Sequence, residues 1–179
     1  GAVVALAHHE PDGPVEPTAI ATTAQRDAGG WPYPSLVLTA LDHDASPLLL
    51  ISDLADHTAN IKADPRAGLL FDGTGGLAEP LTGPRVSVLG RMEVTEDPRH
   101  RARFLARHES ASFYAEFADF TVWRMVVERA HLVAGFGRIH WITAGDLLYQ
   151  LSDTETLALR EPDVVGHMND DHADAVELY

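Results

Sequence analysis

The chain has 179 residues, enough for one domain with a sizeable core, and its 45% hydrophobic and 22% charged residues are typical of a folded globular protein. It carries 13 Lys and Arg against 27 Asp and Glu, a formal net charge of -14. We therefore expect neither nucleic acid nor an anionic membrane surface as a partner. The lack of cysteine excludes disulfides, thiolate metal sites and a cysteine nucleophile, and it fits a cytoplasmic location. Any redox chemistry must therefore use a bound cofactor.

The chain divides by composition into three segments. Residues 8–18 contain three prolines together with acidic residues, which favours an irregular arm, so we expect residues 1–18 to add little to the core. Residues 19–150 form the main domain. The last segment, residues 151–179, has helical character and is expected to be the start of a C-terminal helical domain that continues beyond the chain. No run approaches the roughly 20 apolar residues of a membrane-spanning helix.

Short segments rich in β-branched and leucine residues recur within residues 19–150. The expected strands are residues 20–23, 34–41, 48–52, 67–71, 85–94, 121–128 and 131–142. A hairpin over residues 25–31 connects the first two, because Gly29 and Gly30 permit positive φ. The segment 85–94 is the clearest strand, with valine and methionine alternating with other residues.

Helices are expected between these strands. Asp53 can cap a helix that ends before Pro65, and Asp97 followed by Pro98 is an N-cap with proline at the first helical position. A short helix over residues 111–117 follows. The order β-β-α-β-β-α-α-β-β contains no regularly repeating strand-helix-strand crossover, so it favours a mainly β, closed or partly closed antiparallel barrel.

Four segments, in this order along the chain, resemble one protein family. They are residues 30–37 (GWPYPSLV), 50–66 (LISDLADHTANI leading to DPR), 131–138 (HLVAGFGR) and 166–174 (GHMNDDHAD). The first three resemble the haem-utilization branch of the pyridoxamine-phosphate-oxidase-like, FMN-binding split barrels, and the fourth resembles the start of the C-terminal domain of that branch. The resemblance implies a six-stranded split β-barrel with peripheral helices that works as a homodimer on a cofactor.

In flavin-binding members of such families, the segment that corresponds to residues 51–61 supplies serine, arginine and lysine to the FMN phosphate. Counted back from Pro65, the corresponding positions here hold Ala55, Asp56 and His57. A carboxylate beside a phosphate is unfavourable, so Asp56 argues against FMN bound in the usual pose.

The resemblance leaves a set of candidate cofactor-binding residues near this helix: Ser52, His57, Thr58 and Asn60. The alternative is that these side chains cap the helix and pin it against the barrel. Only His57, Thr58 and Asn60 distinguish cofactor binding from this structural role, because a cap at residue 52 or 53 is expected in either case.

Arg138 is the fifth candidate. Gly135 and Gly137 interrupt the last β-rich segment, which indicates a bulge or the close approach of a ligand, and Arg138 adds a guanidinium that suits a haem propionate or a phosphate. The alternative is a barrel strand with a glycine bulge and an exposed arginine. His131 and His140 flank this segment and are more simply explained as structural side chains.

The last segment contains a histidine-carboxylate pattern. His167 and Asp171 are four residues apart and share a helix face, with Asp174 nearby and His172 turned away. Such groups can hold a divalent metal, but a solvated, capping face explains them more simply, so no metal site is assigned.

Three functions follow from these observations. The first is a haem-binding protein that resembles haem-utilization proteins, some of which open the ring oxidatively. The second is an FMN-dependent oxidoreductase, and the third is a non-catalytic relative that has lost its cofactor. No nucleophile elbow, P-loop, dinucleotide fingerprint or HExxH motif is present, so catalytic residues are left unassigned. We expect Trp31, Phe71 and Trp123 near the contact between two copies.

Overall fold

The computed structural model describes residues 20–26, 29–135 and 137–176. The expected arm, residues 1–18, lies outside the described residues. The three-segment division therefore stays a prediction.

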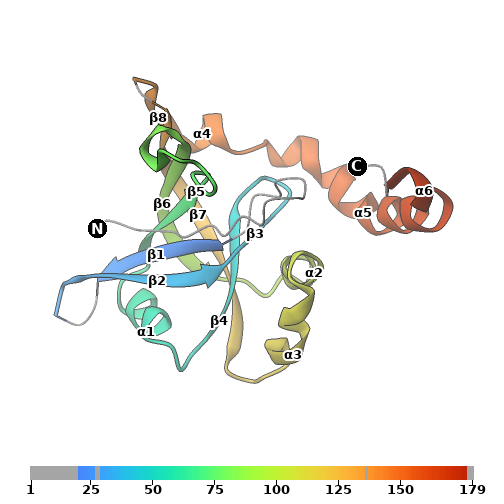
Figure 1. The fold of residues 1–179 in the computed structure, drawn as a ribbon. Coiled ribbons are helices and arrows are strands. Elements are labelled where there is room, and N and C mark those ends of the chain that lie inside the picture. Colours follow the sequence, from blue (N-terminus) through green and yellow to red (C-terminus); the bar gives the residue numbers. More distant parts are fainter. Residues whose placement is uncertain (1–19, 27–28, 136, 177–179) are drawn as a thin grey trace.

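One antiparallel sheet organises the chain (Figure 1). Its strand order is β2-β1-β5-β6-β7-β4-β3, and β8 pairs with the second half of β7. The strands are β1 (Ile20–Arg26), β2 (Pro32–Leu38), β3 (Ala40–Leu41), β4 (Pro47–Ser52), β5 (Arg66–Asp72), β6 (Pro84–Val94), β7 (Phe120–Ala134) and β8 (Ile139–Thr143). The described part thus has eight strands, one more than the seven segments expected from the sequence and two more than the six strands of the expected barrel.

The eighth strand arises because one expected strand is divided in two, and a second boundary lies at another place than expected. The expected strand 34–41 is two strands, β2 and β3, which pair with different neighbours. The end of the chain's β region is one long strand, β7, followed by a hairpin to β8. The glycines there belong to the hairpin turn, since Gly135 and Gly137 have φ of 104° and 76°. The expectation of a bulge inside a strand at this point was wrong.

A bulge does occur earlier in β7. The register between β6 and β7 shifts at Leu89 and Gly90, which leaves Glu128 as the additional residue on β7. The alternation of buried and exposed side chains is interrupted there, with Glu128 and Arg129 both exposed. This interruption explains why the sequence pattern divided β7 into two strands.

The sheet curls on itself. Thr39 alone separates β2 from β3, yet these strands lie at opposite ends of the strand order. The two edges must therefore come together, and Thr39 is buried at this point. No pairing joins β2 to β4 among the described residues, so the barrel stays split, as the sequence predicted.

Two apolar clusters hold the curled sheet. The inner cluster contains, among others, Leu49, Ile51, Leu69, Trp123 and Met125. The second lies between β4, β7 and the helices α2 (Pro98–Arg107) and α3 (Ser112–Ala115), and it contains Leu48, Leu50, Phe104, Ala111, Ala115 and Val122. Strand β4 sends alternate side chains to each cluster, which explains its uninterrupted apolar sequence.

The helices agree with the sequence in place and differ in detail. Asp97 caps α2 by accepting a bond from the Arg99 N–H at 2.9 Å, as expected, and Arg99 lowers the pKa of Asp97 to about 2. Helix α1 (Asp56–Ala63) instead begins after Ala55, so the expectation that Asp53 caps it was wrong. Asp53 forms an ion pair with Lys62 at 2.8 Å.

The C-terminal segment leaves the barrel as a long helix. After α4 (Ala144–Leu147), helix α5 (Leu151–Asp171) continues through Pro162, and α6 (Ala173–Val176) follows. Glu161 joins α5 to the barrel through His43, at 3.1 Å, and through Arg103. In the part of the chain that the structure describes, no helix is long and apolar enough to cross a membrane.

Gly90 offers a test of the bulge. A Cβ at this position would lie 2.3 Å from the carbonyl oxygen of Val126 and 3.0 Å from Met125 Cγ. We expect Gly90→Ala to lower the free energy of unfolding by about 1–3 kcal/mol, as overpacking typically does. Thermal unfolding should show this as a fall of several degrees.

Gly166 is the matched control, because a Cβ there meets no atom within 4 Å. In the interior of α5, Gly166→Ala should raise stability by up to about 1 kcal/mol. An unchanged melting temperature for Gly90→Ala would contradict the packing described at the bulge.

Candidate functional site

Four of the five candidate residues lie at the end of β4 or on α1, and two of them, Ser52 and Thr58, join these elements. The Ser52 hydroxyl donates to the Asp119 carboxylate and accepts the Leu54 N–H at 3.0 Å. The buried Thr58 hydroxyl donates to the Ser52 carbonyl oxygen at 2.6 Å. Both hydroxyl protons are thus used within the protein, and they tie the start of α1 to the end of β4.

His57 lies on the half-buried side of α1. Its Nδ1 is 3.3 Å from the Ser35 hydroxyl of β2, and its Nε2 is buried without a hydrogen-bond partner. Burial lowers the pKa of His57 below its ordinary value of 6.5, although the carboxylate of Asp56 opposes this shift. His57 is therefore a neutral side chain at pH 7. Asn60 is half-buried one turn further along the helix.

These residues do not fit the phosphate of FMN. A phosphate dianion needs cations and free hydroxyl donors, but His57 is uncharged and the hydroxyls are engaged. Lys62, the cation of α1, pairs with Asp53. Asp56 is exposed and adds negative charge. The departure seen in the sequence is thus a departure in the folded structure as well.

Arg138 lies at the other end of the sheet. Ser52 pairs with Phe120, the first residue of β7. The backbone carbonyl oxygen of Arg138, in the turn to β8, accepts the N–H of Ala134, the last residue of β7. The 15 residues of β7 correspond to roughly 45 Å of extended chain. One copy of the chain therefore does not bring Arg138 together with the residues of α1.

The hairpin of β7 and β8 carries a group of cationic and aromatic side chains. His131 and Trp141 are opposite each other across the two strands, with ring centroids 4.7 Å apart. The guanidinium carbon of Arg129 lies 4.9 Å from the centre of the Trp141 ring. We call Arg129, His131 and Trp141 the hairpin surface. The sequence drew attention to His131 but not to its partners, because their contact depends on strand register.

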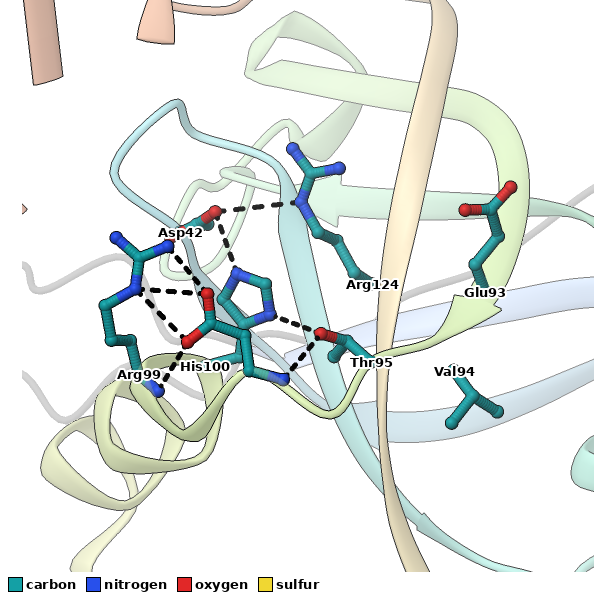
Figure 2. A pocket seen from close by; sticks show the side chains of 8 residues that line it. Asp42, Glu93, Val94, Thr95, Arg99, His100 and Arg124 are labelled. Atoms are coloured by element: carbon teal, nitrogen blue, oxygen red, sulfur yellow. Dashed lines mark hydrogen bonds and ion pairs between the residues drawn. The ribbon is translucent and has the colours of Figure 1, made fainter. Parts of the chain in front are cut away.

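A polar network that the sequence did not predict lies on another face of the barrel (Figure 2). The Asp42 carboxylate is 3.1 Å from His100 Nε2 and 3.6 Å from Arg124 Nε. His100 Nδ1 is 2.7 Å from the Thr95 hydroxyl. Arg124 also donates to the buried Asp44 at 2.5 Å. None of these side chains was among the candidates from the sequence.

The network borders a pocket of about 400 Å³. Its other lining residues are Glu93, Val94, Asp97 and Arg99. The Arg99 side chain pairs with Asp97 at 2.6 Å, and Figure 2 shows Glu93 across the pocket from Asp42. Most charged groups here are neutralised by one another, so the network fastens α2 and the turn after β3 to the sheet.

The C-terminal histidine pattern forms an ion pair. His167 Nδ1 lies 2.8 Å from Asp171, and the rings of His167 and His172 are 4.9 Å apart. Asp174 is exposed on α6. Across the described residues, no three His, Cys, Asp or Glu side chains are grouped so as to hold a metal ion.

Asp42 links the network to the pH dependence of stability. Burial alone would raise its pKa, but the His43 N–H, His100 and Arg124 outweigh burial and lower the pKa below 3.8. The contribution of Asp42 to the free energy of unfolding is therefore present above about pH 3.8, and it is lost as the pH falls through the lower pKa of the folded state. Asp42→Asn should reduce the free energy of unfolding at pH 7 by on the order of 3 kcal/mol, measured by urea denaturation.

The difference in free energy of unfolding between Asp42→Asn and wild type should shrink below pH 4, because the wild-type carboxylate is then progressively protonated. Asp163→Asn is the control, because that carboxylate is 75% exposed and its pair with Arg160 spans 3.6 Å. Equal stability of Asp42→Asn and wild type at pH 7 would contradict the role of the network.

Residues 14–134 match the family model described as pyridoxamine 5'-phosphate oxidase. The chain is also 31% identical, over 149 residues, to the chloroplastic heme oxygenase HOZ of Arabidopsis thaliana. That alignment covers 80% of this chain and 45% of HOZ.

Solved structures have the same fold. A heme binding protein from Mycobacterium smegmatis has a TM-score of 0.69 and 29% identity, covering 88% of this chain and 65% of that protein. ChuZ of Campylobacter jejuni has a TM-score of 0.63 at 17% identity, covering 74% of this chain and 57% of ChuZ, and it shows the fold alone. The chain thus spans under two thirds of the length of each of these proteins. The family match covers most of the curled sheet, and the chain belongs to the pyridoxamine 5'-phosphate oxidase family.

Proposed function

We propose that this chain is the cofactor-binding split barrel of a haem-binding protein, and that it prefers haem to FMN. The observation that carries the proposal is the hydrogen bonding at the start of α1. There the hydroxyls of Ser52 and Thr58 are engaged within the protein. The exposed Asp56 lies beside them, at a place where the resemblance to flavin-binding proteins leads us to expect a cation. A phosphate-bearing flavin loses its usual partners at this site, whereas a haem needs none of them.

The relatives support the same choice. A heme oxygenase and a heme binding protein are 31% and 29% identical to this chain, well above the 14% of a structure related to general stress protein 26 of the pyridoxinephosphate oxidase family. Because the chain covers only part of HOZ, oxidative opening of a haem ring by the whole protein is a further proposal. When bound, the iron of haem would supply that chemistry.

Two alternatives have support of their own. The family description favours an FMN-dependent oxidoreductase. The fully bonded hydroxyls near α1 favour a non-catalytic relative in which Ser52 and Thr58 only pin the helix. Arg138 favours a ligand-binding protein over a relative that has lost its cofactor, because it is exposed beside two glycines at the end of the sheet.

We further propose that two copies associate. The α1 candidates and Arg138 lie at opposite ends of β7, so one ligand can contact both groups only if they come from different copies. Of the three side chains expected at the contact, Trp31 is 73% exposed and Phe71 is half-buried. Trp123 lies inside the inner cluster, so it cannot contribute a surface contact.

Light scattering tests the association. The monomer mass is 19.4 kDa, and we expect a mass near twice this value at micromolar concentration, since an isologous contact would cover the open flank of the barrel. A mass of one chain across the concentration range would refute the homodimer.

Arg138 tests the cofactor. A charge-assisted contact to a carboxylate of the ligand is worth about 1.5–3 kcal/mol, so Arg138→Ala should weaken haemin binding by that amount with little effect on folding. Absorbance titration near the Soret band measures the affinity. The wild type should bind haemin more tightly than FMN.

The matched control is Arg160→Ala, because Arg160 is 71% exposed on α5, away from the hairpin. Equal haemin affinities for Arg138→Ala and wild type would remove Arg138 from the site. Tight FMN binding without haemin binding by the wild type would overturn the proposed function.

A further inference from the structure

We infer that the hairpin surface, Arg129, His131 and Trp141, is where the flat ring of an anionic ligand stacks. This inference rests on the proposed function, because it adds contacts for the same ligand and concerns residues other than the five candidates. The ligand class is a flat conjugated ring system that carries carboxylate or phosphate groups.

The first support is the exposure of Trp141. Its side chain is 61% exposed, although tryptophan is usually well buried in a folded chain. The strand register explains why the barrel cannot cover it. Ala130 and Ile142, which pair across the same two strands, face the inner cluster, so the alternating Trp141 points away from that cluster.

The second support is the packing of His131 and Arg129 against the indole of Trp141. His131 lies directly across from Trp141, with the two rings tilted by 38°, and Arg129 is one step along the same face. Arg129 holds its guanidinium carbon 4.9 Å from the ring centre. The ring is thus fixed from the protein side by two neighbours while much of its surface stays open to solvent. A fixed, exposed indole is suited to stacking, because little conformational entropy is lost when a ligand binds.

The third support is the local charge. Residues 129–143 contain two arginines and two histidines and no Asp or Glu, in a chain with a net charge of -14. The acidic residues on either side are engaged: Glu128 pairs with Arg91 at 3.1 Å, and Asp146 accepts the Thr143 hydroxyl at 2.6 Å. The hairpin therefore attracts anions where most of the chain repels them.

Together these features select a particular chemistry. The indole contributes stacking to any flat ring, and Arg129 contributes a charge-assisted contact to an acidic substituent at the edge of that ring. A tetrapyrrole with carboxylates and a flavin with a phosphate share this chemistry, so the experiment must separate them.

The test uses the whole chain and three variants, Trp141→Ala, Trp141→Phe and Arg129→Ala. Phe113→Ala is the control, because Phe113 is an aromatic side chain that is 81% exposed on α3, outside the hairpin. The probes are haemin, metal-free protoporphyrin IX, FMN and riboflavin, each titrated by absorbance or fluorescence. Protoporphyrin IX separates ring stacking from iron ligation, and riboflavin compared with FMN isolates the phosphate.

We expect Trp141→Ala to weaken binding of haemin and protoporphyrin IX by roughly 5-fold or more, the effect of losing one stacking aromatic. Trp141→Phe should stay closer to wild type because it keeps a ring. Arg129→Ala should weaken both probes about tenfold. Phe113→Ala should bind like the wild type. Circular dichroism of each variant checks that folding is unchanged.

The outcomes separate the two proposals. If the wild type binds haemin and Trp141→Ala binds it equally well, the hairpin surface is not the stacking site, and the proposed function stands. Wild type that binds only FMN, with Trp141→Ala weakened, overturns haem and retains the stacking surface. Wild type that binds no flat anion overturns both. A Trp141→Ala protein that changes from dimer to monomer in light scattering identifies the surface as a contact between copies and overturns the ligand assignment.

Discussion

The fold depends on one short connection. Only Thr39 separates β2 from β3, and these strands lie at opposite ends of the sheet, so the sheet has to curl until its edges meet. The curl encloses the inner cluster and leaves β4 buried on both faces, between that cluster and the helices α2 and α3. It also sets the place of α1, which follows β4 directly. The candidate residues near α1 therefore have positions that the barrel determines.

The junction of β4 and α1 is stabilised by hydrogen bonds within the protein. The Ser52 and Thr58 hydroxyls bind Asp119 and the β4 backbone, so they stabilise the junction whether or not a ligand is present. The start of α1 carries the exposed Asp56 and a neutral His57. Positive charge lies instead on the hairpin of β7 and β8, on Arg129 and Arg138. We therefore propose that the ligand is held at the hairpin by its flat ring and acidic groups, and not by a phosphate at α1.

Much of the fold was predictable because it is encoded locally. The Asp97 and Pro98 cap, the alternation in β6 and the apolar run of β4 are signals of the kind that single sequences carry well. What could not be predicted depends on pairing across the sheet. The bulge at Glu128 interrupts the alternation of β7, and the division of β2 from β3 changes partners without any turn signal. For the same reason His100 was missed as a partner of Asp42, because 58 residues separate them. The contact of Trp141 with His131 and Arg129 likewise depends on a register that only the folded hairpin reveals.

We propose that this split barrel selects haem over a phosphate-bearing flavin. The most direct measurement is a competition, in which the full chain is incubated with equimolar haemin and FMN, passed through gel filtration and examined by its visible absorption spectrum. We expect a Soret band that elutes with the protein and no flavin absorption in the same fraction. Flavin absorption that elutes with the protein, without a Soret band, would contradict this proposal.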